Sequence, residues 1–84
     1  MIEQKADFQL IDVREPYEYN LKNIGGQLIP LSMIIEKSNE IDRNKQVIIH
    51  CKSGGRSQQA IEQLTTEKGF TNLWNLEGGI EGFL

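Results

Sequence analysis

A chain of 84 residues with one cysteine makes one small domain, which buries about 60–65% of its unfolded surface and holds no internal disulfide. Its formal net charge of −3 argues against a nucleic-acid partner, because phosphate backbones require a basic surface. No apolar run approaches the roughly 20 residues of a membrane span and no signal-peptide pattern is present, so we expect a cytoplasmic protein without a membrane partner.

The first half of the chain is predicted to hold one buried strand and two short helices. The apolar run 8–13 predicts a strand covered on both faces. Pro16 predicts the first turn of a helix, where its missing N–H is not needed. A short extended piece follows at 27–30, and Ser32 is a candidate N-cap for a helix that contains 33–35.

The second half of the chain alternates strands and helices. The apolar run 47–51 predicts a strand that ends at the only cysteine. From Ser57 onward, apolar residues share one helical face, and Gly69 marks the end of that helix. A short strand at 71–74 and a final helix from 77 complete the pattern. This alternation predicts an α/β fold with a parallel sheet.

The loop that follows Cys51 carries the strongest functional signal in the chain. A thiol between a strand and a helix faces backbone N–H groups and the positive end of the helix. The two glycines of the loop allow these groups to converge on one anion, because convergence requires φ > 0 at some residues. Lys52 and Arg56 add positive charge, and such surroundings lower cysteine pKa values to roughly 3.5–7.5. The loop predicts a nucleophile, with an inert buried cysteine as the alternative.

Polar or glycine-rich segments follow each predicted strand. Residues 12–14, Cys51 and residues 78–79 each come after a strand. The carboxyl ends of parallel strands lie along one edge of a sheet, where ligands bind. We therefore expect these three segments to meet at a single active site.

Near the predicted edge we assign structural roles to Asp12 and Arg14 and no catalytic role to His50. We expect Asp12 to accept hydrogen bonds from its own loop and Arg14 to be its ion-pair partner, with substrate contact as the alternative. Strand alternation puts His50 and Cys51 on opposite faces, so His50 is not expected to act as the base of Cys51. For the same reason the two residues cannot share an ion, and no metal site is predicted.

Three motifs in this order resemble the rhodanese-like domains, which transfer sulfane sulfur. Residues 10–15, Leu-Ile-Asp-Val-Arg-Glu, match the motif near the family's first buried strand, and 51–57 match its active-site loop. Residues 78–80, Gly-Gly-Ile, match its C-terminal motif, with Phe83 where the family usually has Trp. The resemblance implies an α/β, rhodanese-like fold with a parallel sheet flanked by helices on both faces.

The resemblance also implies a ping-pong sulfurtransferase that needs no cofactor. Cys51 would take sulfur from a small anionic donor such as thiosulfate, or from the persulfide of a cysteine desulfurase, and become a persulfide itself. A separate thiophilic acceptor would then remove the sulfur, because the chain has no second cysteine. The residues implied to bind the donor and the persulfide are Lys52, Ser53, Gly54, Gly55, Arg56 and Ser57.

Residues 23–31 and 51–57 further resemble the rhodanese domain at the C-terminus of adenylyltransferases that serve molybdopterin and thiamine synthesis. This likeness implies a ubiquitin-like sulfur carrier as acceptor and a fused adenylyltransferase domain. Both ends of the chain look cut, since few polar residues precede the first strand and the last helix has barely one turn. We therefore expect one domain over 1–84, truncated at both ends.

Two other functional classes remain open. Dual-specificity phosphatases share, by resemblance, the architecture and a His-Cys signature with a downstream arginine, but their loop is one residue longer than the one between Cys51 and Arg56. A shorter loop makes a smaller cradle, which suits one sulfur atom better than a phosphoryl group. Phosphatase or arsenate-reductase activity is one alternative, and a non-catalytic rhodanese-like binding module is the other.

Overall fold

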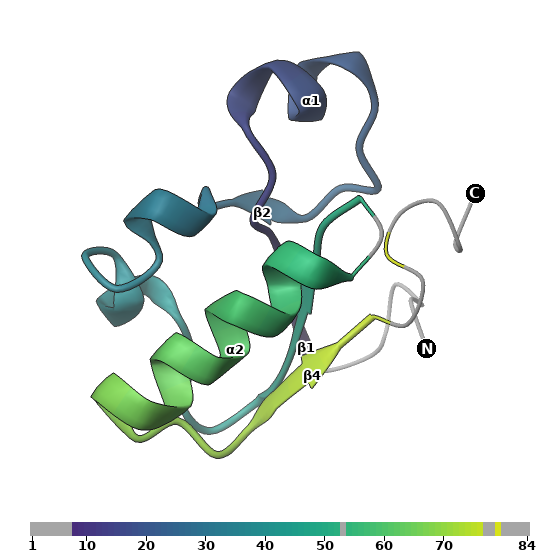
Figure 1. Cartoon of the computed structure of the whole chain (residues 1–84). Coiled ribbons are helices and arrows are strands. Elements are labelled where there is room, and N and C mark those ends of the chain that lie inside the picture. Colours follow the sequence, from purple (N-terminus) through teal and green to yellow (C-terminus); the bar gives the residue numbers. More distant parts are fainter. Residues whose placement is uncertain (1–7, 53, 77–78, 80–84) are drawn as a thin grey trace.

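The computed structural model describes residues 8–52, 54–76 and 79, and its strands form one four-stranded sheet (Figure 1). The strands are β1 (Phe8–Asp12), β2 (Gln27–Leu28), β3 (Gln46–His50) and β4 (Leu73–Asn75). They lie in the order β2-β1-β3-β4, and every pairing is parallel. The prediction of an α/β fold built on a parallel sheet is confirmed.

The two central strands, β1 and β3, supply most of the sheet's contribution to the core. Ile11 pairs with Ile49 in the parallel register, and both side chains are fully buried on one face together with Val47. On the other face Ile48 and His50 are also buried. Burial on both faces explains why these strands read as continuous apolar runs, as parallel strands generally do.

The long helix α2 (Gly55–Lys68) packs on the face that carries Ile49, and it lies across the sheet in Figure 1. Ala60 and Leu64 are its buried residues in the core, one turn apart on the same side. The helix ends at Gly69, which has φ 71°, and the Gly69 N–H donates to the carbonyl of Thr65 at 3.2 Å. The glycine end predicted from the sequence is confirmed.

Two 3₁₀ turns stand where the sequence predicts a helix containing 33–35. They are η1 (Leu31–Met33) and η2 (Ser38–Glu40). Ser32 lies inside η1 rather than at its N-cap, so both parts of this prediction are wrong. The closing hydrogen bond of η1 spans only three residues, and the two isoleucines that follow are β-branched, which disfavours an α-helix. Ile34 is instead fully buried in the core and anchors the turn there.

The short helix α1 (Pro16–Leu21) lies beyond the carboxyl end of β1, next to the loop that leads into β2 (Figure 1). It begins at Pro16 as predicted, and the Glu18 carboxylate accepts the Glu15 N–H at 2.9 Å. The Tyr19 hydroxyl donates to the carbonyl of Gly26 at 2.7 Å, which ties the helix to the loop. The helix is therefore fixed above the edge of the sheet where the cysteine is expected.

The layers of the fold follow from these contacts. Helix α2 and the turn η1 pack against the same core, and the opposite face of the sheet carries the buried side chains of Asp12, Ile48 and His50. The final helix predicted from residue 77 falls, apart from Gly79, outside the described residues. Within the described ranges, no helix combines the length and the apolar character needed to cross a membrane.

Candidate active site

Cys51 follows β3 at the carboxyl edge of the sheet, and its side chain is only 1% exposed. The N–H of Gly54 donates to Cys51 Sγ at 3.0 Å. Gly54 has φ 114°, a conformation that other residues rarely adopt, and from it the chain turns into α2. Gly55 then begins α2, so the sulfur lies at the positive end of a 14-residue helix. These are the features expected for a site that holds an anion on sulfur.

Ser57 and Asn75 fix the first turn of α2 beside the sulfur. The Ser57 hydroxyl lies 3.6 Å from Cys51 Sγ, 2.6 Å from Asn75 Oδ1 and 3.0 Å from the carbonyl of Gly54. Asn75 Nδ2 donates to the same Gly54 carbonyl at 3.2 Å. Sequence reasoning missed Asn75. The available signal was its place at the end of β4, where strand alternation turns it to the same face as Leu73, towards α2.

Arg56 points to α1 and forms a bidentate ion pair there. Its two terminal nitrogens donate to the two carboxylate oxygens of Glu18, at 2.6 and 3.0 Å. The Arg56 side chain is 33% exposed and that of Glu18 is 16% exposed. The hydrogen bonds from Arg56 lower the pKa of Glu18 to about 2, and the same pair raises the pKa of Arg56. Glu18 was not predicted, because no local pattern links two residues 38 positions apart.

Asp12 and Arg14 form a second ion pair, which is buried. The backbone N–H of Arg14 donates to Asp12 Oδ1 at 2.9 Å, and its terminal nitrogen donates to Oδ2 at 2.8 Å. The hydrogen bonds to Asp12 raise the pKa of Arg14. Arg14 also donates to the carbonyl of Lys22. The pair therefore joins the end of β1 to the end of α1, where it can set the position of Glu18.

His50 is fully buried on the face of the sheet opposite Cys51. Its Nε2 lies 3.8 Å from Asp12 Oδ2, and neither ring nitrogen has a hydrogen-bond partner in the described part of the chain. Burial lowers the pKa of His50, which favours the neutral form. Over the same residues, no three His, Cys, Asp or Glu side chains are grouped so that they could hold a metal ion.

Gly79 lies against the backbone of the cysteine loop. It has φ 59°, and a Cβ atom on it would lie 2.6 Å from the carbonyl oxygens of Cys51 and Lys52. Only glycine fits such a close approach of two backbone segments. The expected meeting of the two segments at this edge is confirmed for Gly79, whereas Gly78 and Ser53 lie outside the described residues. The side chain of Lys52 is exposed.

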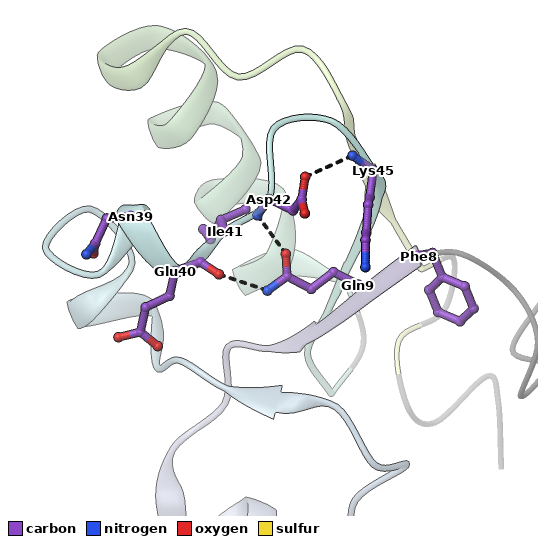
Figure 2. A pocket seen from close by; sticks show the side chains of 7 residues that line it. All are labelled: Phe8, Gln9, Asn39, Glu40, Ile41, Asp42 and Lys45. Carbon is purple, nitrogen blue, oxygen red and sulfur yellow. Dashed lines mark hydrogen bonds between the residues drawn. The ribbon is translucent and has the colours of Figure 1, made fainter.

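A hollow of about 400 Å³ lies at the other, amino edge of the sheet (Figure 2). The Gln9 side chain crosses it, donating to the carbonyl of Glu40 at 3.0 Å and accepting from the N–H of Asp42 at 2.8 Å. The residues that line it are Phe8, Gln9, Asn39, Glu40, Ile41, Asp42 and Lys45. The hollow contains no cysteine and lies at the opposite ends of the strands from Cys51, so it is separate from the candidate active site.

Known proteins resemble this chain in both sequence and fold. YqhL of Bacillus subtilis is 42% identical over 74 residues, which cover 87% of this chain and 58% of that protein. A sulfurtransferase of Allochromatium vinosum is 37% identical over 75 residues, 88% of this chain and 69% of its own. The probable adenylyltransferase/sulfurtransferase MoeZ of Mycobacterium tuberculosis is 38% identical over 74 residues, 84% of this chain and 19% of its own.

The fold gives the same relationship. The crystal structure of a rhodanese-like domain protein from Staphylococcus aureus matches with a TM-score of 0.86 and 29% identity, over 96% of this chain and 78% of that one. The chain spans 58% of the length of YqhL, so it corresponds to part of that relative. The model of the rhodanese-like domain family matches residues 1–84, and the chain belongs to this family, which includes sulfurtransferases.

Proposed function

We propose that the chain is a sulfurtransferase domain that carries sulfane sulfur as a persulfide on Cys51. The observation that carries the proposal is the 3.0 Å hydrogen bond from the Gly54 N–H to Cys51 Sγ at the start of α2. A backbone donor and a helix N-terminus stabilise a thiolate, and the terminal sulfur of a persulfide is an anion of the same kind. Membership of a family with sulfurtransferases supports the same chemistry.

The first half-reaction loads the cysteine. The Cys51 thiolate attacks the outer sulfur of the donor, a new S–S bond forms to Sγ, and the old bond to the outer sulfur breaks. With thiosulfate the bonding electron pair leaves on sulfite, and with a persulfide donor it leaves on the donor thiolate. No proton is transferred if the thiol is already ionised, which is consistent with a site whose one nearby histidine, His50, lies on the other face of the sheet.

The second half-reaction removes the terminal sulfur from Cys51. An acceptor nucleophile attacks the terminal sulfur, and the electron pair of the S–S bond returns to Cys51 Sγ. This chain has no second thiol that could act in cis. We infer that the acceptor is a separate molecule or domain, and we propose a ubiquitin-like sulfur carrier for this role. The likeness to the probable adenylyltransferase/sulfurtransferase MoeZ supports a fused adenylyltransferase domain as a partner. We propose a cytoplasmic location, since a reduced cysteine nucleophile fits a reducing compartment.

The loop residues are assigned roles in the same scheme. Lys52 and Arg56 are assigned to binding an anionic donor, with the attraction from Arg56 reduced by its ion pair with Glu18, and the residues from Lys52 to Ser57 are assigned to holding the carried sulfur. Asp12 and Arg14 support this edge rather than contact the substrate, since their polar groups are engaged with each other and with the backbone. Metal ions and cofactors have no part in the scheme.

Mass spectrometry of the intact protein tests the proposal. The protein is incubated with thiosulfate and, separately, with a persulfide-bearing cysteine desulfurase, and a Cys51→Ala variant is treated in parallel. We expect the wild type to gain one sulfur atom that is lost on reduction, and the variant to gain none. A folded wild type that gains no sulfur from either donor would overturn the proposal. Hydrolysis of an aryl phosphate by that sample would then favour the phosphatase alternative, and inactivity in both assays the binding module.

A further inference from the structure

Both arginines near the cysteine loop are already paired with carboxylates. Glu18 accepts both hydrogen bonds of the Arg56 fork, and Asp12 is paired with Arg14. Each pair sums to no net charge. Of the loop's cationic side chains, Arg56 therefore offers a donor much less attraction than the sequence alone suggests, and the carboxylate beside it is positioned to repel an approaching anion.

The consequence depends on the charge of the donor. Thiosulfate is a small dianion, and near neutral pH it brings two negative charges to a site that already holds the Cys51 thiolate and the Glu18 carboxylate. A persulfide on a partner protein brings one negative charge, and it gains binding energy from the rest of the protein surface. The pKa of Glu18 is lowered to about 2, so its carboxylate stays ionised throughout the physiological range.

We propose that Glu18 is a specificity-determining residue that disfavours small dianionic donors and thereby selects a persulfide carried by a partner protein. The inference rests on the proposed function, since it names the donor class for the same cysteine. The proposal also gives α1 a role, which is to hold Glu18 over the loop. The Glu18 carboxylate accepts the Glu15 N–H, and Arg14 donates to the carbonyl of Lys22 at the end of the helix.

The competing role for Glu18 is purely positional. In that case the carboxylate only holds the Arg56 guanidinium in the orientation that binds the donor, and its removal would weaken thiosulfate binding. The two roles therefore predict opposite changes in the KM for thiosulfate. The sign of the change distinguishes them without any need to know the absolute size of the interaction.

The decisive variant is Glu18→Gln, which removes the charge and keeps an oxygen that can accept from Arg56. We expect the KM for thiosulfate to fall by at least about threefold at low ionic strength, and the difference from wild type to shrink in high salt as charges are screened. With a persulfide-bearing cysteine desulfurase as donor we expect no such gain. The ratio of kcat/KM for the two donors should therefore move towards thiosulfate.

The matched control is Glu67→Gln. It makes the same change in net charge on an exposed residue in the last turn of α2, about 18 Å along the helix from the loop. We expect this variant to keep the wild-type KM for thiosulfate. A Glu18→Gln protein whose KM is unchanged or raised while wild type still loads sulfur would overturn the inference and leave the proposed function standing.

A measurement on the wild type covers the case in which Glu18→Gln fails to fold. If the carboxylate repels the donor, added salt lowers the KM for thiosulfate, because screening weakens repulsion. If Arg56 dominates and attracts the donor, added salt raises it. Failure of wild type to load sulfur from any donor would instead count against the proposed function itself.

Discussion

The two edges of the sheet are held together by different kinds of interaction. At the amino edge, neutral amides join the loops: Gln9 binds the backbone of Glu40 and Asp42, and Asn72 donates to the carbonyls of Asp42 and Lys45 at 2.7 and 2.6 Å. At the carboxyl edge, two arginine–carboxylate pairs and the close approach of Gly79 to the loop do the same work. The amino edge is thus joined by side-chain amides and by Arg43, which donates to the carbonyl of Lys68 at 2.7 Å, whereas two arginine–carboxylate pairs and Gly79 lie at the carboxyl edge.

The hollow and the cysteine loop lie at opposite edges of the sheet. The hollow of about 400 Å³ lies at the amino edge, where the Gln9 side chain is hydrogen-bonded to the backbone of Glu40 and Asp42 (Figure 2). Cys51, the proposed nucleophile, lies at the carboxyl edge and is almost fully buried. Backbone donors and paired charges mark the proposed reactive centre, which lies away from this hollow.

The largest effect is expected where two backbones touch at the carboxyl edge. Gly79→Ala places a Cβ 2.6 Å from the Cys51 carbonyl and forces alanine to φ 59°. We expect a loss of at least about 2 kcal/mol in the free energy of unfolding and a fall of more than about tenfold in the rate of sulfur loading. Thermal unfolding and loading kinetics measure the two effects.

The control for this prediction is Gly55→Ala. A Cβ on Gly55 would meet nothing within 4 Å, and the residue opens α2 without a positive φ. We expect this variant to load sulfur at nearly the wild-type rate, because Gly55 is assigned to the site through its backbone, which alanine keeps. If both alanine variants behaved alike, the contact at Gly79 would not be what holds the loop.

A smaller effect is expected when the charged fork of the carboxyl edge is removed. Arg56→Ala deletes a cation near the donor and leaves the Glu18 carboxylate without its partner. We expect the KM for thiosulfate to rise about tenfold with a smaller change in kcat, as for a lost hydrogen bond to a charged group. Steady-state kinetics at constant ionic strength test this. An unchanged KM would place Arg56 outside the donor site.

Matched amide deletions test whether the two edges differ in their effect on Cys51. Gln9→Ala and Asn75→Ala each remove hydrogen bonds to backbone or buried groups, and each should cost about 1–2 kcal/mol in the free energy of unfolding. Only Asn75→Ala should alter the rate at which iodoacetamide alkylates Cys51, because Asn75 fixes Ser57 beside the sulfur. Equal alkylation rates in the two variants would contradict the positioning role of Asn75.

The smallest effect is the pH dependence contributed by Glu18. Its pKa is about 2 in the folded chain against an ordinary value of 4.5, so the unfolded chain binds its proton more readily. The Arg56 pair therefore stabilises the fold fully above pH 4.5, and this contribution is lost as pH falls towards 2. For a partly exposed pair we expect about 1 kcal/mol. Urea unfolding of wild type and Glu18→Gln should differ at pH 6 and converge near pH 2. A difference in the free energy of unfolding that does not change with pH would contradict the assignment of this effect to Glu18.

The sequence predicts those parts of the fold that depend on local pattern and topology. Apolar runs gave β1 and β3, glycine gave the end of α2, and the parallel sheet then brought Cys51 and Gly79 to one edge. The helix expected at 33–35 failed, because β-branched residues and burial of Ile34 outweighed the capping signal of a single serine.

Parts of the site that depend on side-chain pairing were not predictable. Glu18 and Arg56 are 38 positions apart, and Ser57 and Asn75 are 18 apart. Their contacts follow from where α1 lies above the edge of the sheet and where β4 lies within it, which no local pattern encodes. The chemistry of the cysteine loop could thus be read from its residues, whereas the groups that orient that loop required the structure.

The burial of Cys51 has a consequence for how a loaded domain differs from an empty one. An S–S bond is about 2 Å long, so the proposed persulfide carries its reactive atom that far beyond a thiol that is only 1% exposed. The thiol of the empty domain is almost fully buried, and the proposed persulfide places the reactive sulfur one atom further out. A partner protein that can contact only this terminal sulfur would bind the loaded domain and not the empty one. The depth of the reactive sulfur would then distinguish the two states.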